Sequence, residues 1–175
     1  HPAFIRWNTD INPGEVTIAH ILNSNGYKTG FVGKFHNYDN EAVQLTNPLD
    51  SDPNDPPVKE RMKKNYEMLV KRVREVTGFD YIKNIYGNNL HALELPKELQ
   101  YHNMEWITSA GLDFIEQNSD EPFFLYFSTT VPHEPPPVSS LKADTGITPL
   151  GYEPIPDQVF FNVSNGQVYP KKKRQ

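Results

Sequence analysis

The feature that most constrains the fold is a helix pattern that passes directly into a strand pattern, seen most clearly in residues 16–36, VTIAHILNSNGYKTGFVGKFH. Thr17 is suited to begin the helix, because its hydroxyl accepts an orphan backbone N–H of the first turn. Gly26 is suited to end it, because glycine adopts the left-handed C′ conformation without steric cost. Residues 27–33, with aromatic and β-branched side chains punctuated by glycines, then predict a strand. Three apolar residues at helical spacing predict one shared helix face: Ile18, Ile21 and Leu22.

The same order of patterns recurs along the chain. Residues 58–76 predict a helix and residues 79–86 a strand, and residues 103–117 predict a further helix. Residues 123–127, FFLYF, are a continuous apolar run, which is typical of a strand covered on both faces. Helices that lead into strands predict an α/β layered fold. We expect residues 27–33 and 123–127 to be neighbouring or near-neighbouring strands of one mostly parallel sheet, with helices on both faces and an unpaired edge prone to self-association.

Length, charge and cysteine content exclude several classes of protein. The 175 residues suffice for one domain or part of a larger one, and the proline-rich residues 137–175 predict an irregular loop region. The net charge of −5 argues against general nucleic-acid binding, which needs a clustered basic surface. No apolar run approaches the roughly 18 residues of a membrane span. The chain has no cysteine, which excludes disulfides, thiolate metal sites and cysteine nucleophiles.

Polar side chains follow two of the predicted strands where each strand ends. Lys34 and His36 are two residues apart, so on extended backbone they point to the same side. His133 follows the second strand and lies between prolines that restrict the backbone. Ligands of open α/β sheets bind at the carboxyl ends of the strands, which predicts that these three side chains line one pocket for a small anion. The alternative is a surface lysine with two histidines that hydrogen-bond to nearby backbone.

These residues lie in motifs that resemble those of the sulfatase family. GYKTGFVGKFH resembles the family's GY-x-T-x-x-x-GK-x-H signature, and Pro132-His133-Glu134-Pro135 resembles its P-H-x-P element after an apolar strand. The segment WITSAGLDFIEQNSDEPFFLYFS is also similar to the family, so the resemblance covers residues 12–135. It implies a fold like alkaline phosphatase, with a large mixed sheet between helices. It also implies hydrolysis of sulfate esters by a formylglycine, made from cysteine or serine and activated by a bound calcium ion.

The resemblance implies a role for each matching residue. Lys34 would bind the sulfate and the nucleophile's oxygen, and His36 would orient the gem-diol of the nucleophile. His133 would contact the sulfate and assist the leaving group. The physical reason is that charge develops on the oxygens of the transferred group, so donors and cations must be aimed there beforehand.

The departures from the family pattern concern the nucleophile and the metal. The C-x-P-S-R motif, the paired aspartates, the later Asp-Asn pair and a third lysine are absent. We therefore expect residues 1–175 to be an internal segment of a single sulfatase-like catalytic domain, inactive by itself. The calcium ligands and the formylglycine would lie outside it. Asp50, Asp52 and Asp55 are interpreted as a solvated turn, and no metal ligand is assigned.

The implied partners are a sulfate-ester small molecule or glycan and the remainder of the sulfatase chain, with no nucleic acid and no membrane span. The family resemblance implies a secreted, periplasmic or lysosomal location. A phosphodiesterase or phosphonate monoester hydrolase of the same superfamily is the first alternative, and a non-catalytic anion-binding module is the second. His20 is interpreted as a surface or packing residue, residues 171–174 as solvated surface, and Asn162 as a glycosylation sequon without a firm assignment.

Overall fold

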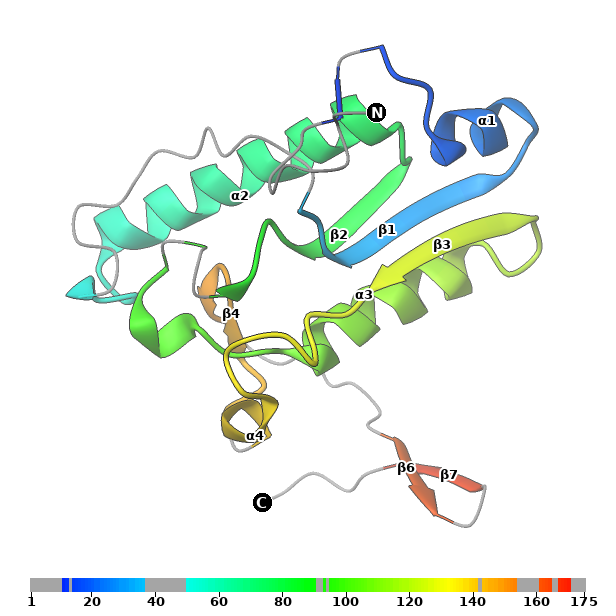
Figure 1. Cartoon of the computed structure of the whole chain (residues 1–175). Coiled ribbons are helices and arrows are strands. Elements are labelled where there is room, and N and C mark those ends of the chain that lie inside the picture. Colours follow the sequence, from blue (N-terminus) through cyan, green and yellow to red (C-terminus); the bar gives the residue numbers. More distant parts are fainter. Residues whose placement is uncertain are drawn as a thin grey trace.

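The computed structural model describes residues 11–12, 14–36, 50–90, 93, 95–141 and 143–153, together with the backbone of residues 161–164 and 167–170. Helices and strands alternate through its first three quarters (Figure 1). The elements that build the main layer are α1 (Ile18–Ser24), β1 (Lys28–Lys34), α2 (Pro56–Thr77), β2 (Tyr81–Tyr86), α3 (Met104–Gln117) and β3 (Phe123–Ser128). Shorter elements follow or intervene: the 3₁₀ turn η4 (Lys97–Leu99), α4 (Pro137–Ser140), β4 (Ile147–Thr148), β5 (Gly151–Tyr152), β6 (Phe161–Ser164) and β7 (Gln167–Pro170).

The main sheet has the strand order β2-β1-β3, and both pairings are parallel. The predicted pairing of the first strand with residues 123–127 is therefore confirmed. One hydrophobic cluster joins β1 and β2 to α1 and α2, and it includes Phe31 and Val73. A second cluster joins the opposite face to α3 and includes Val32 and Ile107. Adjacent residues of β1 thus face opposite layers, and helices cover both faces of the sheet as expected (Figure 1).

The order of the strands determines where a ligand would meet the sheet. The chain leaves β1 through α2 to reach β2, and it then crosses the opposite face through α3 to reach β3 on the other side of β1. Successive right-handed crossovers require this change of face when the direction reverses. The reversal leaves a topological switch point between the carboxyl ends of β1 and β3, the position at which open α/β sheets bind ligands.

Helix α1 begins and ends where the sequence predicts, but it packs by a different side chain. Thr17 is its N-cap, and Gly26 follows its end with a φ of 83°. Ala19 is completely buried against the cluster beside α2, whereas Ile18 and Ile21 are 53% and 50% exposed. The predicted apolar face is therefore mostly in solvent, and the helix packs on the cluster through Ala19 instead.

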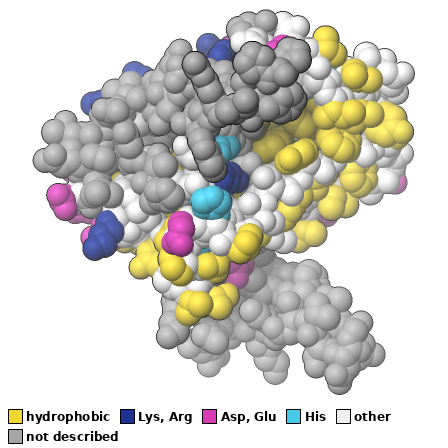
Figure 2. Space-filling view, viewed as in Figure 1, with side chains coloured by type: hydrophobic (Ala, Val, Ile, Leu, Met, Phe, Trp, Pro, Cys, Tyr) yellow, Lys and Arg dark blue, Asp and Glu magenta, His cyan; other side chains and the backbone are white. Residues whose placement is uncertain are grey.

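Strand β3 is confirmed as a strand, but the expectation that both its faces are covered was wrong. Phe123, Tyr126 and Phe127 are 37%, 50% and 41% exposed. Within the described residues β3 pairs only with β1, so it is an edge strand and receives less cover than a central one. Figure 2 shows hydrophobic side chains gathered in a broad area on this side of the molecule.

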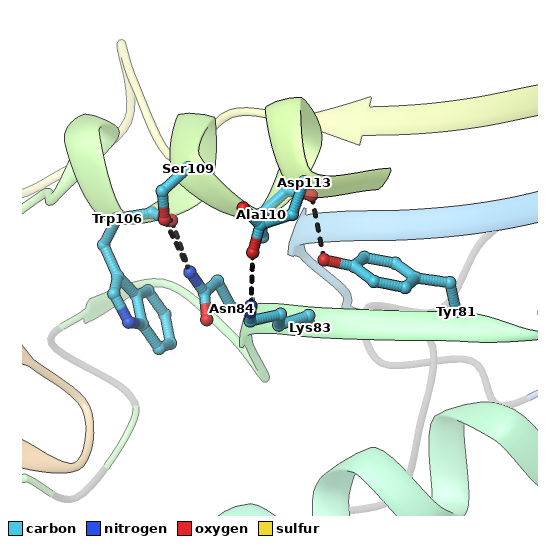
Figure 3. A network of polar contacts seen from close by, with 7 residues as sticks. All are labelled: Tyr81, Lys83, Asn84, Trp106, Ser109, Ala110 and Asp113. Carbon is cyan, nitrogen blue, oxygen red and sulfur yellow. Dashed lines mark hydrogen bonds and ion pairs between the residues drawn. The ribbon is translucent and has the colours of Figure 1, made fainter. Parts of the chain in front are cut away.

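Helix α3 is tied to β2 by polar contacts as well as by packing (Figure 3). The hydroxyl of Tyr81 donates to the carbonyl of Ala110, and Lys83 forms an ion pair with Asp113. Asn84 is the extra residue of a β-bulge, since Lys83 pairs with Val32 and Ile85 with Gly33. Its φ of 50° lies in the left-handed region, which asparagine tolerates better than most residues. The Asn84 amide donates to the carbonyl of Trp106 and to Ser109 on α3, which holds the bulge in place.

The region predicted as an irregular loop contains short elements. The helix α4 and the antiparallel pairs β4–β5 and β6–β7 all lie within residues 137–170. Buried Ile147 packs with Met62 of α2, so this region contributes to a third hydrophobic cluster. The side chain of Asn162 and residues 171–174 lie outside what the structure describes.

Candidate functional site

Polar side chains follow the end of each of the three parallel strands. We call this group of residues the rim: Lys34, His36, Asn89 and His133. Lys34 is the last residue of β1, and His36 follows it. Asn89 follows β2, and His133 follows β3 in a turn closed by its own N–H, which donates to the carbonyl of Thr130. Because the strands are parallel, all these positions lie at the carboxyl edge; Lys34, His36 and His133 follow the two strands that flank the switch point, and Asn89 follows β2 on the other side of β1.

Direct contacts join the residues of this rim. The ammonium group of Lys34 donates to Oδ1 of Asn89, and Nδ2 of Asn89 lies 3.3 Å from Nε2 of His133. One amide group therefore spans the gap between Lys34 and His133. Burial lowers the pKa of His36, and interaction with Lys34 and His133 lowers it further, so all three predicted residues lie in one neighbourhood. Figure 2 shows a basic side chain next to histidine side chains on this face, with an acidic side chain beside them.

The rim has more hydrogen-bond donors than acceptors. The backbone N–H of Glu134 donates to Nδ1 of His133 at 2.9 Å, so the neutral ring carries its proton on Nε2. The ammonium group of Lys34 can only donate hydrogen bonds. The Asn89 amide is therefore assigned with its acceptor, Oδ1, toward the ammonium and with Nδ2 toward the His133 ring. Two N–H donors then face each other across 3.3 Å. Water or any other group that accepts hydrogen bonds satisfies both of them, and an oxyanion does so while also meeting the charge of Lys34.

Partial burial lowers the pKa of two residues of the rim, Lys34 and His36. Burial lowers the pKa of Lys34, although the ammonium form still dominates near neutral pH. Burial is also the largest cause of the lowered pKa of His36, followed by electrostatic interaction with Lys34 and with His133. His36 is therefore neutral at pH 7. Among the described residues no carboxylate lies within ion-pair distance of Lys34, so none of these residues neutralises its charge.

Asn89 is the residue of this rim that sequence reasoning missed. The strand before it was predicted, and the rule that ligands meet the carboxyl ends of parallel strands applies to β2 as much as to β1 and β3. The available signal was therefore the run Gly87-Asn88-Asn89 directly after the predicted strand. It was not used because neither asparagine is titratable and no motif contains them.

The other polar residues considered lie away from the rim. The ring of His20 accepts the backbone N–H of Thr17 at 3.2 Å and lies against Gly78, so it serves the start of α1. Asp52 accepts the backbone N–H of Asn54 within a turn, and Asp55 occupies the N-cap position of α2. These contacts are local and do not bring the carboxylates together.

The fold and the rim define an α/β protein that presents a lysine, an asparagine and two histidines at the carboxyl edge of a parallel sheet. The sequence matches the Sulfatase family model over residues 3–147, a range that includes Lys34, His36, Asn89 and His133. The chain therefore belongs to the sulfatase family, whose members are hydrolases of the alkaline phosphatase superfamily. The comparison with curated proteins found no match.

Sulfatases usually use calcium and a formylglycine, and the described residues do not fit either group. No three histidine, aspartate or glutamate side chains among them lie close enough together to hold a metal ion, whereas calcium takes six to eight oxygen ligands. The chain also has neither a cysteine nor a serine at the first position of a C/S-x-P-S-R sequence, the setting in which the family makes its formylglycine. In the part of the chain that the structure describes, no helix has both the length and the apolar character of a membrane span.

Proposed function

We propose that Lys34, Asn89 and His133 bind the sulfate group of a sulfate ester, and that the chain supplies this anion site to a sulfuric ester hydrolase. The observation that carries the proposal is the pair of donors, Asn89 Nδ2 and His133 Nε2, that face each other beside the Lys34 ammonium. Sulfate oxygens are acceptors only, so they satisfy both donors and pair with the charge. The family membership of the chain supports the same assignment.

Each side chain has a distinct role in this proposal. Lys34 compensates the negative charge on the sulfate oxygens, and Asn89 fixes one of these oxygens. His133 directs Nε2–H toward the ester oxygen on which charge develops as the bond to sulfur breaks. Groups held in place beforehand stabilise such charge without reorganisation, which is the largest contribution in many enzymes. His36 is neutral and adjacent, which suits it to orient an uncharged nucleophile rather than to bind the anion.

Binding and turnover separate in this proposal, because the residues described bind an anion but provide no nucleophile or metal site. We expect no saturable turnover of aryl sulfates or aryl phosphates by the 175-residue chain, with or without calcium. Turnover that is lost when a residue of this chain is mutated would contradict that expectation and would show a complete site.

The binding step is tested by titrating the chain with sodium sulfate while following the histidine ring signals by NMR. We expect saturable shifts of the His36 and His133 signals with a dissociation constant of about 1 mM, since that affinity needs only about 4 kcal/mol. The matched variant is Asn89→Asp, which keeps the shape of the side chain but places a carboxylate beside Lys34. It should abolish the shifts, whereas His20→Ala should leave them unchanged.

The same titration with sodium phosphate and with a phosphonate addresses the alternative in the same superfamily. A phosphodiesterase or phosphonate monoester hydrolase would use the same donors, because its anion presents the same acceptor oxygens. Binding of sulfate at least as tight as that of phosphate supports the sulfatase assignment. Binding of phosphate alone would favour the alternative, and no binding of any of these anions would refute the proposed site.

A further inference from the structure

A second histidine, His102, is buried beside the turn that carries His133. Its side chain is only 5% exposed, and it precedes the N-cap residue of α3. Nε2 of its ring lies 2.7 Å from the carbonyl oxygen of Pro135, whereas Nδ1 is buried and has no partner among the described residues. A carbonyl oxygen only accepts, so Nε2 must carry the proton. Among the described residues, the ring of His102 therefore makes one hydrogen bond, to the segment that follows His133.

The turn that carries His133 has few means of fixing itself. Four of its residues lack a backbone N–H: Pro132, Pro135, Pro136 and Pro137. The two N–H groups between these prolines are used within the turn, by His133 toward Thr130 and by Glu134 toward the His133 ring. The carbonyl groups of Pro136 and Pro137 accept from Ser139 and Leu141 of the following turn, whereas the carbonyl of Pro135 lies within hydrogen-bond distance of the His102 ring, which comes from another part of the fold.

The start of α3 contacts the segment around His133 on both sides. Before His133, the hydroxyl of Thr130 lies 3.9 Å from the sulfur of Met104. After it, the ring of His102 holds Pro135, and the backbone N–H of His102 donates to the hydroxyl of Ser140. These contacts relate the His133 turn to α3, and α3 is itself fixed to β2, the strand that precedes Asn89 (Figure 3).

We propose that His102 is a positioning residue, which sets the distance between His133 and the Lys34–Asn89 pair through its hydrogen bond to Pro135. This inference rests on the proposed function, since the distance matters because one anion must reach all three groups. Nε2 of His133 and Nδ2 of Asn89 are 3.3 Å apart, so a shift of the turn by about 1 Å is large beside that spacing.

The test uses the whole chain with two substitutions at one position. His102→Phe keeps a ring of similar size but removes the donor, and His102→Gln keeps an N–H donor at the end of a side chain of similar reach. Ser140→Ala is the control, because it removes another contact of the same segment without touching Pro135. For each protein, the His133 ring signals, the dissociation constant for sulfate and the midpoint of urea unfolding are measured.

We expect His102→Phe to shift the His133 ring signals and to weaken sulfate binding about tenfold, as when one donor is displaced from its ligand. His102→Gln should restore both readouts to within about twofold of the wild type, and Ser140→Ala should change them less than His102→Phe does, because the bond to Pro135 remains. Unchanged His133 signals in His102→Phe would overturn the inference. It would also fail if His102→Gln restored the unfolding midpoint but not the signals, because His102 would then be only structural.

The two proposals fail in different ways. If the wild type does not bind sulfate but its His133 signals move in His102→Phe and return in His102→Gln, the positioning role stands and the proposed function falls. If the wild type binds sulfate and His102→Phe binds it equally well with unchanged His133 signals, the proposed function stands and the positioning role falls.

Discussion

Substitution of Gly33 by alanine tests the pairing on which the whole rim depends. Gly33 precedes Lys34 in β1 and lies opposite Ser128 of β3, with a φ of 91°. A Cβ atom at this position would lie 1.7 Å from the carbonyl oxygen of Ser128. That atom belongs to backbone and cannot rotate away, so the strands must separate locally. The change would therefore move Lys34 relative to His133.

The magnitude follows from a matched comparison with Gly26. Gly26 has a similar φ of 83°, but a Cβ atom there would meet nothing within 4 Å. Gly26→Ala therefore reports the backbone cost alone, about 1 kcal/mol for a left-handed residue with a side chain. Gly33→Ala adds the overlap, for which overpacking costs about 1–3 kcal/mol and an immovable neighbour favours the upper end. We expect it to lose at least about 3 kcal/mol of a typical total of roughly 5–15 kcal/mol.

Urea unfolding followed by far-UV circular dichroism measures both variants against the wild type. The expected result is a small fall in the unfolding midpoint for Gly26→Ala and a large one for Gly33→Ala, with similar slopes. If the two variants lie within about 0.5 kcal/mol of each other, the close approach of β1 and β3 at Gly33 is refuted, since additivity errors are of that size. Sulfate binding by Gly33→Ala should weaken even where the variant is folded.

Three further predictions concern the rim and the helix beside it. In a sulfatase with a complete active site, Lys34→Ala should lower turnover about a hundredfold, as the loss of one preorganised contact commonly does, while His20→Ala should have little effect on turnover. The pKa of His36 is lower in the folded protein than its ordinary value, so the neutral ring contributes to stability above the ordinary pKa, and this contribution is lost as the pH falls through the lowered value. The urea unfolding midpoint should therefore fall less between pH 7.5 and pH 5 in His36→Gln than in the wild type. Asp113→Asn should cost less than about 1 kcal/mol in urea unfolding, because its ion pair with Lys83 is partly exposed.

The elements of the main sheet were predictable because local chemistry specifies them. Thr17 and Gly26 define the ends of α1, and alternation between the two faces follows from the strand period. Exposure was less predictable. The FFLYF run has the composition of a covered strand, yet its cover depends on which elements lie beside β3, and that is decided by strand order. The sequence pattern predicts that a segment is a strand, but it does not predict which elements lie beside that strand.

The rim was predictable in its charged and titratable members only. Lys34, His36 and His133 follow strands that a parallel sheet brings to one edge, so their meeting follows from topology. Asn89 and His102 were not predicted, since their parts depend on contacts that cross the fold. One joins Lys34 to His133, and the other reaches the carbonyl of Pro135. Such contacts leave no periodic pattern in the sequence.

The use of an amide between Lys34 and His133 has a chemical reason. A carboxylate at position 89 would pair permanently with Lys34, and an incoming anion would have to displace it while being repelled by it. The amide of Asn89 instead gives Lys34 a neutral acceptor, which leaves the positive charge uncompensated, and it turns its N–H group toward His133. An anion that enters meets two donors and a cation without having to break an ion pair. In the proposed function, these groups are therefore in place before the oxyanion arrives, which is the condition under which their electrostatic contribution to a reaction is largest.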